Sequence, residues 1–178
     1  MIAFHVKINL FIVCPNGTYA DSHSSSRLCV ALCPPGTLSS TASPNLYGDP
    51  TTHTCVSRCI TPYTWSDYQT RLCEPICSAT SVPTYSENVG MTCVTALNCP
   101  SSPMMTFGDN ATRSCVSFCS NAEWGDPTTR NCEDQCPDTL TPETTRYYGD
   151  NSTGQYLCVL ICPETPRMFG ENTTNLCV

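Results

Sequence analysis

The spacing of sixteen cysteines constrains this 178-residue chain more than any other feature. After Cys14 they come in pairs separated by three residues, except for Cys93 and Cys99, which are separated by five. The other pairs are Cys29/Cys33, Cys55/Cys59, Cys73/Cys77, Cys115/Cys119, Cys132/Cys136 and Cys158/Cys162, followed by Cys177. Cysteine at this level is typical of a disulfide scaffold. The pattern indicates a tandem repeat.

The apolar core available to such a chain is small. Leu, Ile, Val and Phe together make up 32 of the 178 residues. Order must therefore come from disulfides, which reduce the entropy of the unfolded chain. Disulfides persist in oxidising compartments, so we expect a secreted, extracellular or cell-surface protein. The net charge of −7 argues against nucleic acid as a partner, and no stretch is long and apolar enough to predict a transmembrane helix.

An aromatic residue, a small residue and an acid precede the closing cysteine of every repeat. The eight copies start at Tyr19, Tyr47, Trp65, Tyr85, Phe107, Trp124, Tyr148 and Phe169. We expect each unit to be a short strand, a turn and a second short strand with the cysteine. The predicted fold is small, disulfide-rich and mostly β or irregular, an elongated tandem array of about eight single-disulfide β-hairpin modules with an N-terminal β-strand. Units 1 to 8 span 14–33, 33–59, 59–77, 77–99, 99–119, 119–136, 136–162 and 162–178.

Turn-forming residues follow the acid of each unit, as in Asp49-Pro50 and Asp109-Asn110. Asp at the first position of a turn accepts a hydrogen bond from the backbone two residues on. A basic residue often follows four positions after the acid, as Arg113 follows Asp109 and Arg130 follows Asp126. We expect these to form surface ion pairs that clasp the turn, each contributing about 0–1 kcal/mol.

Two serial connectivities use all sixteen cysteines. The nearest-neighbour scheme pairs Cys14–Cys29, Cys33–Cys55, Cys59–Cys73, Cys77–Cys93, Cys99–Cys115, Cys119–Cys132, Cys136–Cys158 and Cys162–Cys177. The interlaced scheme pairs first with third and second with fourth, and makes the structural repeat two units long. We favour the nearest-neighbour scheme because the aromatic motif recurs in every unit, and each bridge then contributes about 3 kcal/mol in the entropic model.

The N-terminal segment 1–13 contains no cysteine and alternates between apolar and other residues. Its apolar face carries Ile2, Phe4, Val6, Ile8, Leu10 and Ile12. A period of two predicts a half-buried strand. A signal peptide is the competing interpretation, but Lys7 and Asn9 interrupt the stretch and no small-residue cleavage site follows. We expect an assembly strand that pairs with or packs on another copy of the chain.

Four N-x-S/T motifs occur, at Asn16, Asn110, Asn151 and Asn172. The last three lie directly after the acid of their unit, at the predicted tip of a turn. Because turn tips are exposed, we expect covalent glycans at these asparagines.

Stretches such as GDPTTHTCVSRC and GDNATRSCVSFC resemble the tandem cysteine-rich repeats of protist extracellular surface proteins, which are also similar to furin-like and growth-factor-receptor cysteine-rich repeats. The resemblance covers residues 14–178. It implies single-disulfide modules stacked into an extracellular rod, and membership of surface coats, surface antigens or appendage filaments. The segment 1–13 lies outside the resemblance.

No motif indicates catalysis, a cofactor or a bound metal. His5, His23 and His53 form no metal-binding or general-base pattern, and no nucleophile or phosphate-binding motif is present. Three residues between cysteines, rather than two, and an oxidising compartment argue against zinc. We expect an extracellular structural glycoprotein, a self-associating rod in a filament, surface coat or appendage. The alternative is the stalk of a cell-surface receptor or adhesin, or a surface antigen.

Overall fold

The computed structural model describes residues 14–21, 28–35, 45–60, 62–79, 82–120, 123–137, 146–164 and 167–178. These residues form sixteen short strands and one 3-10 turn, Ala96–Asn98, with no α-helix among them. Within these described ranges, no helix is long and apolar enough to cross a membrane. The predicted strand with Ile2, Phe4, Val6, Ile8, Leu10 and Ile12 lies outside the described residues.

Each unit contributes one antiparallel hairpin. The first strand carries the aromatic motif and the second carries the closing cysteine, so Gly48 lies opposite Cys55 and Gly108 opposite Cys115. The hairpins of units 1 to 4 are β1 (Tyr19–Ala20) with β2 (Cys29–Val30), β3 (Tyr47–Asp49) with β4 (Thr54–Val56), β5 (Trp65–Asp67) with β6 (Leu72–Glu74), and β7 (Tyr85–Glu87) with β8 (Thr92–Val94). Those of units 5 to 8 are β9 (Phe107–Asp109) with β10 (Ser114–Val116), β11 (Trp124–Gly125) with β12 (Cys132–Glu133), β13 (Tyr148–Asp150) with β14 (Leu157–Val159), and β15 (Gly170–Glu171) with β16 (Leu176–Cys177).

Successive hairpins join through parallel pairing. The first strand of one unit pairs with the second strand of the next, which gives a ten-stranded sheet in the order β2-β1-β4-β3-β6-β5-β8-β7-β10-β9. The remaining strands form a six-stranded sheet in the order β12-β11-β14-β13-β16-β15. A parallel bridge between Gly108 and Asn131 connects the two sheets. The described strands therefore form one continuous ladder.

The alternation of antiparallel and parallel pairing reverses the direction of every other hairpin. The closing strands β2, β6, β10 and β14 run one way, and β4, β8, β12 and β16 run the other way. The structural repeat is therefore two units long. Sequence reasoning associated that repeat with interlaced disulfides, but it arises from strand direction.

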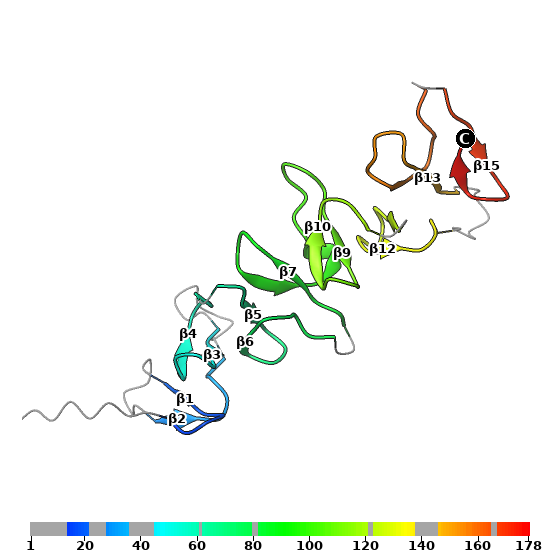
Figure 1. Ribbon diagram of the computed structural model, residues 1–178. Helices are drawn as coiled ribbons and strands as arrows, with labels where there is room; N and C mark the ends of the chain where they lie inside the picture. The colour runs from blue at the N-terminus through cyan, green and yellow to red at the C-terminus, as the bar shows by residue number, and fades with distance from the viewer. Residues whose placement is uncertain are drawn as a thin grey trace, which may run out of the picture.

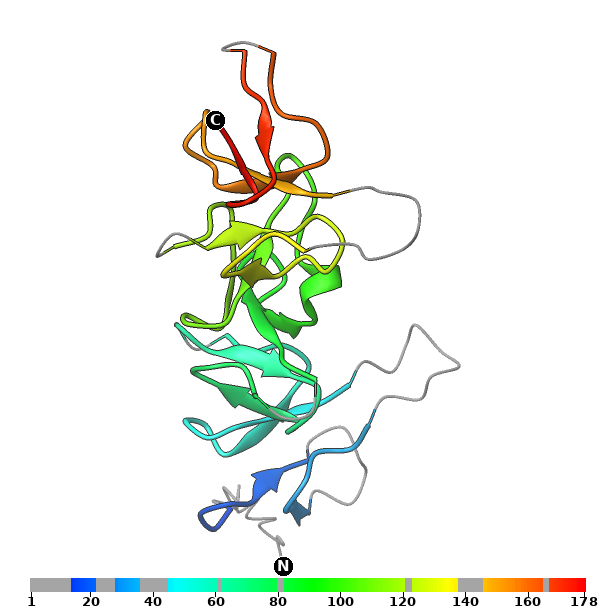
Figure 2. The same cartoon turned by 90° about the vertical axis from the view of Figure 1, so that its right-hand side faces the viewer.

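The units follow one another along a single long axis, from β1 and β2 at one end to β15 at the other (Figure 1). The view turned by 90° shows the same extended arrangement (Figure 2). Sixteen strands at a spacing of about 4.8 Å give a ladder of about 75 Å.

Cysteines and aromatic rings form the core, which consists of small clusters at the junctions between units. One cluster contains Tyr19, Cys33, Leu46 and Cys55, and another contains Phe107, Cys119 and Cys132. The predicted disulfide-rich β array is confirmed.

Candidate functional site: the junctions between units

All sixteen cysteines lie within the described residues and none is free. They form the eight disulfides of the nearest-neighbour scheme, with Cα–Cα distances of 5.5–5.7 Å. Each disulfide closes one hairpin unit. The array thus carries one covalent cross-link per unit along its length.

The acid of each motif organises the turn that follows it. In five units the aspartate Oδ1 accepts a 2.8 Å hydrogen bond from the N–H two residues on, at Thr51, Gln69, Ala111, Thr128 and Ser152. A threonine hydroxyl three residues on also donates to Oδ2 in units 2, 5 and 6. These bonds confirm the expected turn-capping role. These five aspartates are buried, so the hydrogen bonds compensate for the loss of water.

The last residue of the turn adopts a left-handed conformation in units 2 to 8. Its φ lies between 49° and 63° at His53, Arg71, Met91, Arg113, Arg130, Tyr156 and Asn175. Its carbonyl accepts a hydrogen bond of 2.8–2.9 Å from the central residue of the preceding motif, from Ala20 at the first junction to Gly149 at the last. One main-chain hydrogen bond of the same type therefore crosses each of the seven junctions.

The aromatic ring of one unit packs against the central residue of the next motif. A Cβ built on Gly108 would lie 2.6 Å from the Tyr85 ring, and one built on Gly125 would lie 2.8 Å from the Phe107 ring. Gly48, Gly149 and Gly170 meet the rings of Tyr19, Trp124 and Tyr148 in the same way. These glycines permit a close approach that a side chain would block.

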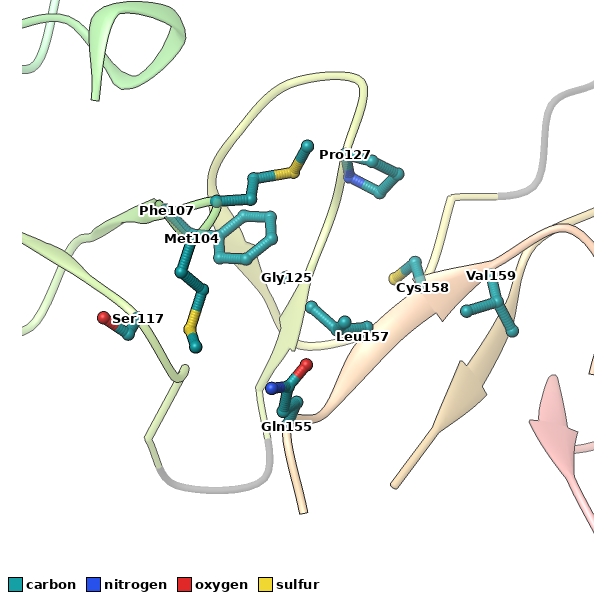
Figure 3. A pocket seen from close by; sticks show the side chains of 10 residues that line it. Met104, Phe107, Ser117, Gly125, Pro127, Gln155, Leu157, Cys158 and Val159 are labelled. Carbon is teal, nitrogen blue, oxygen red and sulfur yellow. The ribbon is translucent and has the colours of Figure 1, made fainter. Parts of the chain in front are cut away.

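Some hydrophobic clusters include residues of three successive units. Phe107 of unit 5 lies over Gly125 of unit 6, and Leu157 of unit 7 packs against its cluster (Figure 3). Leu72 of unit 3 packs against the cluster that contains Tyr19 of unit 1. The junctions therefore couple more than nearest neighbours.

The basic residues of the turns contact the preceding unit. The Arg113 guanidinium lies 5.2 Å from the Tyr85 ring centroid and donates to the carbonyl of Ser78. The Arg130 guanidinium lies 5.9 Å from the Phe107 ring centroid and donates to the carbonyls of Cys99, Pro100 and Thr106. The expected ion pair between each of these arginines and the acid of its own turn is therefore wrong. Each arginine instead covers the aromatic ring of the preceding unit. Sequence spacing could not identify this partner, which lies 24–35 residues away.

The asparagines of the N-x-S/T motifs Asn16, Asn110, Asn151 and Asn172 are exposed. The Tyr85 hydroxyl donates to Asn110 Oδ1 at 2.8 Å, and the Tyr148 hydroxyl donates to Asn172 Oδ1 at 3.0 Å. Both bonds cross a junction and leave Nδ2, the atom that carries an N-linked glycan, outside the contact. Burial raises the pKa of the Tyr85 hydroxyl, and the nearby Arg113 charge opposes this rise.

A small cavity of about 220 Å³ lies beside Phe107 (Figure 3). Met104, Pro127, Leu157 and Val159 contribute apolar walls. No lining side chain can titrate, since Cys158 is bonded to Cys136. The volume is below the roughly 300 Å³ at which ligand pockets usually begin.

The described residues contain no group of three or more His, Cys, Asp or Glu side chains that could hold a metal ion. The motif acids of units 2 to 8 lie in separate turns, and each accepts a hydrogen bond within its own turn. The repeated chemistry of the array is therefore that of packing and hydrogen bonding between units.

A scan against protein-family models found no match to this chain. Searches of curated proteins and of solved structures likewise found no similar sequence or fold.

Proposed function

We propose that this protein is an extracellular structural glycoprotein, a rod-like protomer of a filament, surface coat or appendage. The observation that carries the proposal is the continuous ladder, in which eight disulfide-closed hairpins share the same main-chain hydrogen bond at seven junctions. Such a construction maintains an extended shape with little apolar core. The resemblance of residues 14–178 to cysteine-rich surface repeats supports the same proposal.

Exposed apolar side chains supply contacts between rods. Because alternate hairpins reverse, the bends after β2, β6, β10 and β14 lie along the same margin of the ladder. In each bend the residue directly before the second cysteine is a large apolar one with 50–83 % of its surface accessible, at Leu32, Ile76, Phe118 and Ile161, and the bend after β14 also exposes Leu160. On the other margin the residue directly before the second cysteine is polar, Arg58, Asn98 or Gln135, although the bend after β8 also exposes Leu97. An apolar residue at the same place in alternate bends favours lateral contact between rods over a solitary stalk.

The test is electron microscopy of surface material from the source cells, with gold-labelled antibody against the chain. We expect periodic label along a filament or coat. Isolated labelled rods that project from the membrane would instead favour the receptor or adhesin stalk.

The covalent part of the proposal needs a second measurement. Strong reductant with thiol alkylation should collapse the structures, whereas mild denaturant with the disulfides intact should leave them extended. Retention of shape after complete alkylation would contradict the role of the disulfides.

The glycans need a separate test. Release of mass by an N-glycosidase, with conversion of Asn110, Asn151 and Asn172 to aspartate, would support their presence.

A further inference from the structure

The two outer edges of the described ladder expose residues that the inner junctions bury. Phe169, on the β15 side, is 66 % exposed, whereas its counterpart Phe107 is 2 % exposed. On the β2 side, Leu28 is 60 % exposed, whereas the equivalent Leu157 and Leu176 are partly buried. Each edge therefore presents one half of a junction.

The inner junctions follow a rule of size. The central residue of a motif lies opposite the residue that precedes the closing cysteine of the next unit. Glycine lies opposite leucine at three junctions, Gly48↔Leu72, Gly125↔Leu157 and Gly149↔Leu176. Alanine or serine lies opposite threonine or serine at three others, Ala20↔Thr54, Ser66↔Thr92 and Ser86↔Ser114. The remaining junction pairs Gly108 with Asn131.

The physical basis of the rule is the space beneath the aromatic ring. Where the central residue is glycine, the ring approaches the backbone and the neighbouring strand has room for a leucine that packs against it, as Leu157 packs near Phe107. Where the central residue carries a Cβ, smaller side chains stand opposite. The pair thus specifies which edges fit together.

The outer edges obey this rule with respect to each other. The open β15 edge offers glycine, Gly170, and the open β2 edge offers leucine, Leu28. The geometry points to head-to-tail association, in which the β15 edge of one copy pairs in parallel with the β2 edge of a second copy. Gly170 then lies opposite Leu28 of the second copy, beneath the Tyr148 ring, and Phe169 covers Ala20 of the second copy.

This inference rests on the proposed function and names the contact through which rods join. Such a contact is heterologous, so it does not close on itself and copies can add without limit. Edge strands recognise one another through main-chain hydrogen bonds, and the side chains provide specificity. With eight units in the ladder, an even number, the alternation of hairpin direction and the apolar margin continue from copy to copy.

The test uses the full oxidised chain and two variants that each block one edge. Gly170→Leu places a side chain where the Tyr148 ring lies, and Leu28→Asp puts a charge on the other edge. Light scattering and negative-stain microscopy would follow association as concentration rises. We expect the unaltered chain to form end-to-end strings with a repeat of about 75 Å, and each variant alone to associate at least roughly tenfold more weakly.

An equal mixture of the two variants gives the decisive result. Each keeps one good edge, the β15 edge in Leu28→Asp and the β2 edge in Gly170→Leu. The mixture should therefore form dimers and nothing longer. Val89→Asp, which alters a side chain that is 84 % exposed in the turn of unit 4, away from both edges, is the matched control and should leave the strings intact.

The outcomes separate the two proposals. Assembly of both edge variants that is as strong as that of the unaltered chain would overturn head-to-tail docking. The structural function would then depend on contacts through another surface. A chain that stays monomeric at every concentration, while the source material shows labelled filaments, would also overturn the docking contact. Failure of both assembly and periodic labelling would overturn both.

Discussion

Two regions of the ladder use the same motif with different results. In the central region, the units after those of Tyr85 and Phe107 have glycine at the central position of the motif, Gly108 and Gly125. Both aromatic residues are 2 % exposed. In the region before it, Tyr47 and Trp65 are followed by units with serine at the central position, Ser66 and Ser86, and both rings are only partly buried.

The difference indicates what glycine contributes to a junction. Glycine lets the aromatic ring of the preceding unit contact the backbone directly. Arg113 or Arg130 covers the other face of that ring. Glycine alone does not bury the ring completely, since Trp124 contacts Gly149 but remains partly exposed. In that junction Tyr156, with a ring centroid 5.5 Å from that of Trp124, replaces the arginine. The two most buried rings, Tyr85 and Phe107, therefore combine glycine on one side with a guanidinium on the other. Tyr19 is 7 % exposed over Gly48, where the turn residue is His53.

The largest effect is expected from Phe107→Ala. Truncation of this buried ring leaves a cavity among Cys119, Cys132 and Leu157, and should cost about 3–5 kcal/mol. Denaturant unfolding of the oxidised chain would measure the loss. Phe169→Ala is the matched control, because the same residue type at the outer edge is mostly exposed. Similar losses at the two positions would contradict the distinction between inner and outer rings.

A smaller effect is expected from Gly108→Ala. The added Cβ meets the Tyr85 ring at 2.6 Å, so the ring must move, at a cost of about 1–3 kcal/mol. Ser86→Ala is the control, since it loses only the hydroxyl contact with Ser114. Tyrosine fluorescence quenching would detect exposure of Tyr85 in the first variant alone. An unmoved, fully buried Tyr85 ring in Gly108→Ala would refute the proposed role of glycine.

Much of the unit was predictable, because its determinants are local in sequence. Closing disulfides, the hairpin and the aspartate cap follow from residues within one loop, as Asp109 and Ala111 illustrate. The junctions were not predictable in this way. The parallel pairing of Gly125 with Leu157 and the contact of Arg130 with Cys99 join residues of different units. Their partners depend on reversed hairpins, which no spacing within a unit encodes.

The left-handed residue at the end of the turn in units 2 to 8 was also missed. It is Arg, His, Met, Tyr or Asn rather than glycine, so composition does not reveal it. Its position directly before the second strand is the signal that an aligned set of the eight units could have provided.

The aspartate caps should contribute less than the rings. Asp109→Ala removes the acceptor for the Ala111 N–H and the Thr112 hydroxyl, and should cost about 1–2 kcal/mol. Asp109→Asn keeps one carbonyl oxygen as an acceptor and should cost less. Hydrogen exchange at the Ala111 amide would report the local loss, and equal protection in all three proteins would exclude the capping role.

The smallest effect is expected at the outer edge, where Glu171 takes the place of the buried aspartates. Hydrogen bonds from Thr174 and then Thr173 lower the pKa of the Glu171 carboxyl from 4.5 to about 2. Because the folded pKa lies below the unfolded value, the ionised carboxylate stabilises the folded chain above about pH 4.5, and this contribution disappears as the pH falls toward 2.

Carboxyl NMR titration should therefore show Glu171 ionised at pH 3.5, and Glu171→Gln should remove this part of the acid dependence of stability. Because this carboxylate is solvent-exposed, the effect is weak compared with the loss of a buried ring. A normal titration near pH 4.5 would show that its turn is looser than the aspartate turns of the inner units. The effect of the missing neighbour would then extend from the outer strand β15 into the turn of unit 8.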